Sequence, residues 1–100
     1  MKKGKLLIMG LRLTEIEFIK LCREKVCEYA LEHVDKTDNV ILTPEDVYVV
    51  WYSKSLQNHK ALLSTPLSDG MYYELTYNGD KEELYFDAYK KFENRCIQNK

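Results

Sequence analysis

The stretch from Asp46 to Asn94 constrains the fold of this chain most, because strand-forming runs and turn signals alternate along it. Two runs rich in β-branched and aromatic residues flank a polar loop at residues 55–58, a pattern that predicts a hairpin. A third strand is predicted over Met71–Tyr77. Asn78-Gly79 is a strong hairpin signal, and it predicts a fourth strand at Glu83–Phe86. These features together predict an antiparallel sheet.

Two amphipathic segments flank the predicted strands. Thr14 and Glu17 have the spacing of a capping box, which predicts the start of a helix. The apolar stripe of this helix recurs every three or four residues and comprises Phe18, Ile19, Cys22, Val26, Tyr29, Ala30 and Val34. Asp87 is a predicted N-cap for a closing helix with a buried stripe of Ala88, Tyr89, Phe92 and Cys96. The expected fold is therefore α+β, an antiparallel four-stranded sheet with N- and C-terminal helices packed on one face (α-β-β-β-β-α).

The length of 100 residues predicts one domain. We expect residues 1–13 to form a flexible or loosely held N-terminal arm and residues 14–100 to form a single α+β domain. The apolar run Leu6–Met9 is too short for a secretory signal, and no later segment has the length of a membrane span. Three cysteines, Cys22, Cys27 and Cys96, cannot all pair, so we expect reduced, buried thiols in a cytoplasmic protein.

Catalytic and metal-binding patterns are missing from the sequence. His33 and His59 have no cysteine or carboxylate at metal-ligand spacing. The four glycines do not form a phosphate-binding loop, and no serine lies in a nucleophile elbow. We therefore predict a protein that is not an enzyme, with no catalytic residues, no metal and no cofactor.

A ligand site is instead predicted around the first hairpin and the strands beside it. Aromatic rings can stack on a base, lysines can meet phosphates, and amide side chains can read base edges. The predicted ligand-binding residues are Trp51, Tyr52, Lys54, Gln57, Asn58, His59, Lys60, Tyr72, Asn78 and Lys81. The alternative interpretation is structural, because strand aromatics often form cross-strand pairs and loop amides often stabilise turns.

The first strand also predicts self-association. Val47, Val49 and Trp51 alternate with Tyr48, Val50 and Tyr52, so that both faces of the strand are apolar. Two helices can cover only one face of the sheet. A second copy placed against the other face would bury it, which predicts a homodimer or a higher even oligomer.

Several blocks of the sequence resemble a domain-of-unknown-function family of small proteins from phages and prophages of Gram-positive bacteria. The resemblance extends from about Phe18 to Asn94 and rests on the blocks Asp46–Trp51, Lys54–Thr65, Asp69–Glu74, Thr76–Lys81 and Asp87–Asn94. It implies a phage-encoded accessory protein in the cytoplasm of the bacterial host cell, and it brings no established activity.

The leading functional hypothesis is a non-enzymatic counter-defence or host-takeover factor that binds and sequesters a nucleotide-type immune signal. One alternative is a protein–protein inhibitor of a bacterial defence or replication enzyme, which would dock through the acidic ridge Glu24, Glu28 and Glu32 or through an exposed sheet face. The second alternative is a weak nucleic-acid-binding module, which a net charge of −1 disfavours.

Overall fold

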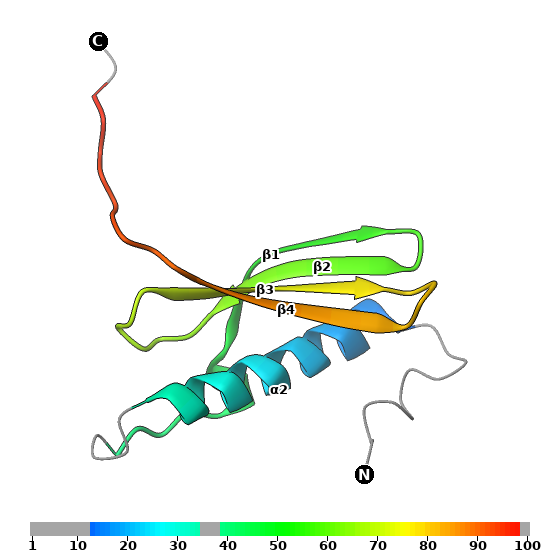
Figure 1. Cartoon of the computed structure of the whole chain (residues 1–100), viewed down its shortest axis with the longest axis horizontal. Coiled ribbons are helices and arrows are strands. Elements are labelled where there is room, and N and C mark those ends of the chain that lie inside the picture. The colour runs from blue at the N-terminus through cyan, green and yellow to red at the C-terminus, as the bar shows by residue number, and fades with distance from the viewer. Residues whose placement is uncertain (1–12, 35–38, 99–100) are drawn as a thin grey trace.

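A computed structural model describes residues 13–34 and 39–98 of the chain. One α-helix packs against one face of a four-stranded antiparallel sheet, so an α+β fold is confirmed (Figure 1). The strands lie in sequence order across the sheet. The elements are the helix α2 (Glu15–His33), the 3-10 turn η2 (Pro44–Asp46) and the strands β1 (Tyr48–Ser55), β2 (Asn58–Ser64), β3 (Met71–Asn78) and β4 (Glu83–Lys90).

Helix α2 begins at the predicted capping box. The Glu17 amide donates to the Thr14 hydroxyl over 3.1 Å, and the Thr14 amide donates to the Glu17 carboxylate over 2.9 Å. These two bonds satisfy amides that have no partner within the helix. The buried side of α2 comprises Phe18, Cys22, Val26, Cys27 and Ala30, four of which belong to the predicted stripe.

The central strands β2 and β3 provide the sheet side of the core. As the alternation in β3 predicts, Tyr73, Leu75 and Tyr77 are buried. Ala61 and Leu63 of β2 lie opposite Leu75 and Tyr73 and are also buried. The large apolar side chains of the core therefore lie between α2 and the middle of the sheet.

The predicted closing helix is wrong within the described residues. Strand β4 continues to Lys90, and Asp87, Ala88 and Tyr89 pair with Glu74, Tyr73 and Tyr72 of β3. Residues 91–98 form neither helix nor strand. β3 is long enough to form backbone hydrogen bonds with the whole of β4. These bonds favour a strand over the helix that the spacing of the four apolar residues predicts. Cys96, predicted to be buried on that helix, is exposed, whereas Cys22 and Cys27 are buried as expected.

The predicted N-terminal arm lies outside the described residues except for Leu13. Leu13 is buried in the core, next to the start of α2. No helix of the described part of the chain is both long and apolar enough to cross a membrane.

A β-bulge in β1 changes which side chains share a face. The pairing with β2 shifts between Val49 and Trp51, leaving Val50 as the extra residue. Val49 and Tyr52 consequently both pack against the core, whereas Tyr48 and Trp51 lie on the opposite face. The predicted grouping of Tyr48 with Tyr52, and of Val49 with Trp51, is therefore wrong.

Candidate functional site

The face of the sheet opposite α2 is not covered by any described helix or strand (Figure 1). We call it the open face. Three rows of paired residues cross it, each with one residue from every strand. From one end of the sheet to the other, the rows are Tyr48-Ser64-Tyr72-Tyr89, Trp51-Leu62-Glu74-Asp87 and Ser53-Lys60-Thr76-Tyr85.

Large aromatic side chains give the open face its character. Trp51 is 41% exposed, and Tyr48, Tyr85 and Tyr89 are each about half exposed. Adjacent strands lie about 4.8 Å apart, so side chains in one row are close neighbours. Trp51 beside the partly buried Leu62 forms a flat apolar platform on which a planar ligand could stack.

The charges of the open face are mixed. Glu74 lies 3.7 Å from the ammonium of Lys60, and its other carboxylate oxygen accepts a bond of 3.4 Å from the Tyr89 hydroxyl. The ammonium of Lys91 lies 5.6 Å from the centre of the Tyr72 ring, within the range of a cation–π contact. Two lysines can therefore meet an anionic group here, while Glu74 and Asp87 oppose a large polyanion.

Two of the predicted ligand-binding residues, Tyr52 and His59, belong to the core side of the sheet. His59 is 1% exposed and stacks on Phe18, with ring centres 4.9 Å apart. Its Nε2 lies 3.0 Å from the Leu13 carbonyl and its Nδ1 lies 2.6 Å from the Tyr52 hydroxyl. The carbonyl can only accept, so Nε2 carries the proton, and Nδ1 accepts from Tyr52. Burial lowers the pKa of His59, which favours this neutral form.

The polar residues of the two hairpin loops mainly bond to each other. The Asn58 side chain accepts from the Gly79 amide over 2.8 Å, and the Gln57 side chain donates to Asp80. Gly79 is required by this contact, because a Cβ there would lie 2.3 Å from the Gln57 carbonyl oxygen. The two loops thus support each other at one end of the sheet.

The remaining loop residues have similar local roles. Asn78 accepts from the amides of Asp80 and Lys81 over 3.0 and 3.2 Å, which closes the turn before β4. The Lys54 ammonium donates to the Leu56 carbonyl in the turn that follows β1. Lys81 is exposed in its loop. Of the ten predicted residues, Trp51, Lys60 and Tyr72 lie in the three rows of the open face, and Asn58 and Asn78 follow the same strand alternation but bond loop amides.

The predicted ligand site lacks five further residues that contribute to this surface, Tyr48, Leu62, Tyr85, Tyr89 and Lys91. Tyr85 and Tyr89 are an even number of positions apart, which indicates that they share one face if both lie in one strand. The sequence pattern instead predicts Tyr89 in the closing helix. Tyr48 and Trp51 are an odd number of positions apart and share a face only because of the bulge.

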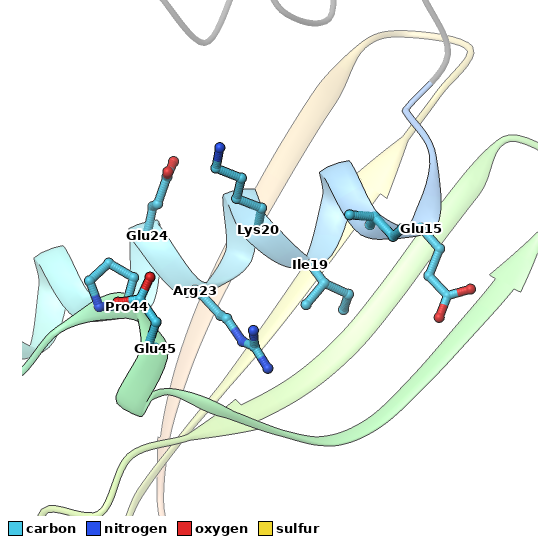
Figure 2. A pocket seen from close by; sticks show the side chains of 8 residues that line it. Glu15, Ile19, Lys20, Arg23, Glu24, Pro44 and Glu45 are labelled. Carbon is cyan, nitrogen blue, oxygen red and sulfur yellow. The ribbon is translucent and has the colours of Figure 1, made fainter.

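Apart from the open face, a hollow lies along α2 beside η2 (Figure 2). It is an open cavity of about 490 Å³. Figure 2 shows Ile19 and Arg23 pointing from α2 toward β1, whereas Lys20 and Glu24 point to the opposite side of the helix. The buried Nε of Arg23 has no hydrogen-bond partner in the described residues. Glu15, Glu24 and Glu45 also line the cavity, so its charge does not favour an anion.

Thiol and metal chemistry have little support in the described ranges. Burial raises the pKa of Cys22 to about 12, and burial is also the main reason for the raised pKa of Cys27. Both thiols therefore stay protonated near neutral pH. Residues 13–34 and 39–98 contain no group of three or more His, Cys, Asp or Glu side chains that could hold a metal ion.

The fold and the open face define a small α+β protein whose most prominent surface is an aromatic sheet face. The chain belongs to a family of unknown function, DUF6275, whose model matches residues 19–99. No curated protein matches the chain, and no solved structure does.

Proposed function

We propose that this chain is a phage-encoded, cytoplasmic binding protein without catalytic activity, which holds a nucleotide-type ligand on the open face and so sequesters an immune signal of the host. The exposed platform formed by Trp51 and Leu62 beside Lys60 is the observation that carries the proposal. The sequence resemblance supports a phage origin, and the counter-defence role is inferred from that origin together with the ligand platform. Both remain part of the proposal.

The charges of the open face narrow the class of ligand. Trp51 would stack on a base, and Lys60, one strand away, would pair with a phosphate. Glu74 and Asp87 would repel a chain of phosphates, and the whole chain has a net charge of −1. A small nucleotide with few phosphates therefore suits this surface better than long DNA or RNA.

The test is calorimetric titration with a panel of cyclic oligonucleotides, mononucleotides and ADP-ribose derivatives. We expect at least one compound to bind with a Kd below about 10 µM, which corresponds to about 7 kcal/mol. The complete absence of such binding would refute the proposal. A gel shift at low salt should show no retardation of single-stranded DNA or RNA.

Three charge variants locate the ligand. Lys60→Ala should weaken binding about tenfold, or about 1.4 kcal/mol. Glu74→Gln should strengthen it, because Lys60 loses its ion-pair partner and a negative charge leaves the platform. Lys81→Ala is the matched control, since it removes the same charge from the end of the sheet and should leave Kd unchanged.

Self-association through the open face is a second candidate role for the same surface, favoured by the exposed aromatic rings of Tyr48, Trp51, Tyr85 and Tyr89. Such a dimer would hide the platform from a ligand. If a dimer forms through the open face, Tyr85→Glu should lower the mass measured in solution. If the open face is free, Tyr85→Glu should leave that mass unchanged.

A further inference from the structure

The chain continues past β4 as an exposed arm, which we define as residues 91–98. It is extended and leads away from α2 (Figure 1). The Lys91 amide donates to the Gly70 carbonyl over 2.7 Å, so the base of the arm is held beside the loop before β3. Phe92 is 92% exposed and Ile97 is 81% exposed, and both are among the least covered apolar side chains described. Two such residues on one extended segment suit a binding arm better than a solvated tail.

A groove that could receive an arm runs between α2 and the strands β3 and β4. It consists of two open cavities of about 310 and 220 Å³, and Tyr29 lines both. The larger cavity has an apolar floor of Tyr29, Leu84 and Phe86, in which the rings of Tyr29 and Phe86 lie 5.2 Å apart. Lys25, Glu28 and Glu32 form its rim.

The arm and the groove have complementary chemistry. The arm contains Lys91, Glu93 and Arg95, of which the ammonium of Lys91 lies over Tyr72 on the open face, and the rim of the larger cavity has a net charge of −1. Among the residues that the structure describes, Arg95 bonds to the nearby Glu93, with its Nε 2.7 Å from the carboxylate. Phe92 and Arg95 are three positions apart, a span of about 10 Å in an extended chain. The apolar floor offers a partner to Phe92, and Glu32 and Glu28, the latter 3.8 Å from Lys25 of the same rim, offer one to Arg95.

We propose that the arm of one copy docks in the groove of a second copy, with Phe92 on the apolar floor and Arg95 beside Glu28 and Glu32. The arm leads away from its own helix, so a second chain is the occupant that its direction favours (Figure 1). Reciprocal exchange of two arms closes a two-fold dimer, in which the same patch is used twice. This interface lies on the helix side of the sheet. Apart from Lys91, whose ammonium lies over Tyr72, the contacts of this interface are separate from the open face and from the ligand proposed there.

Light scattering on the full chain tests the interface. The wild type should have a mass near twice 11.9 kDa at about 100 µM, and Phe92→Asp should have the mass of one chain. Ile41→Asp is the matched control, because Ile41 is 88% exposed but lies outside the arm and the groove, and its mass should equal that of the wild type. A wild-type monomer, or a Phe92→Asp dimer, would overturn the proposal.

A charge exchange gives a second, independent readout. Glu28→Lys with Glu32→Lys should raise the dimer dissociation constant at least tenfold, and Arg95→Glu alone should also raise it. All three changes in one chain should restore the dimer, because the charges then attract again with opposite sign. Glu24→Lys changes a carboxylate of α2 that lines the other hollow, and it should have little effect. Failure of the triple variant to recover the dimer, while each variant stays folded by circular dichroism, would contradict the assigned contacts.

Discussion

At the scale of single residues, His59 shows how the structure assigns a role that composition cannot. A histidine between an asparagine and a lysine in a predicted hairpin suggests a polar, ligand-facing residue. The fold instead buries it between Phe18, Tyr52 and the Leu13 carbonyl, where both ring nitrogens have partners. The sequence pattern contains no signal for this, because Leu13 is 46 positions away.

This burial predicts a loss of stability in mild acid. The pKa of His59 is lowered in the folded state, mainly by desolvation, so the unfolded chain takes up a proton first as the pH falls. The free energy of unfolding should be fully retained above about pH 6.5 and should decrease below it. Urea unfolding between pH 7.5 and pH 5 measures the slope.

The other histidine supplies a control for this experiment. His33 is exposed at the end of α2, and His33→Gln removes an imidazole outside the core for comparison in the same titration. His59→Gln should lower the stability at pH 7.5, because a buried ring is lost, and should flatten the slope below pH 6.5. An equal slope in wild type and His59→Gln would show that other groups cause the acid sensitivity.

At the scale of elements, the two hairpin loops act as one unit. Asn58 and Gln57 of the first loop bond Gly79 and Asp80 of the second, which links the ends of β1 and β2 to the ends of β3 and β4. Asn78-Gly79 correctly indicates the hairpin. The turn itself extends over four residues, 79–82, and the residue in it with a positive φ is Glu82, at 54°.

A methyl group at Gly79 should therefore separate the loops. Gly79→Ala places a Cβ 2.3 Å from the Gln57 carbonyl oxygen. This oxygen can move only if the turn before β2 moves with it. We expect a loss of about 1–3 kcal/mol in the free energy of unfolding, from strain and from the displaced loop bonds. Asp80→Ala removes only the bond from Gln57 and should cost less than about 0.5 kcal/mol. Similar values for the two variants would argue against a close contact between the loops.

Element boundaries show what could be predicted from this sequence and why the rest could not. Helix α2 and the alternation of β3 follow from local spacing, and both are confirmed. The end of β4 does not, since Ala88, Tyr89 and Phe92 fit a helix as well as a strand. Pairing with β3 decides between them, and pairing depends on residues 15 or more positions earlier. The bulge at Val50 likewise depends on the match between β1 and β2, which no local pattern encodes.

The strand conformation at Ala88 can be tested by a β-branched substitution. Ala88→Val should leave the free energy of unfolding unchanged or raise it by up to about 1 kcal/mol, because Val suits a strand and Ala88 is exposed opposite Tyr73. In a helix the same change would be unfavourable by about 0.5 kcal/mol. Urea unfolding measures the sign, and backbone chemical shifts of residues 87–90 report the conformation directly.

At the scale of the whole molecule, the fold has two layers and two different outer surfaces. One surface is the open face, and the other is formed by α2 with its flanking grooves (Figure 1). An arm-exchanged dimer would use the helix side and leave the open face free for a ligand. A dimer through the open face would do the opposite. The two arrangements therefore make different predictions for Trp51, the only tryptophan in the chain.

Acrylamide quenching of Trp51 fluorescence distinguishes these arrangements. Trp51 is 41% exposed on the open face, so the quencher should reach it in the free protein. If the open face is free in the dimer, quenching should stay constant from about 1 to 100 µM protein, across the range in which a weak dimer forms. Phe92→Asp should give the same quenching as wild type, because its interface lies on the opposite side of the sheet.

A nucleotide that stacks on Trp51 should reduce quenching as it saturates the protein, and Lys60→Ala should shift that protection to higher ligand concentration. Quenching that falls with protein concentration alone, in the absence of ligand, would instead show that a second copy covers the open face.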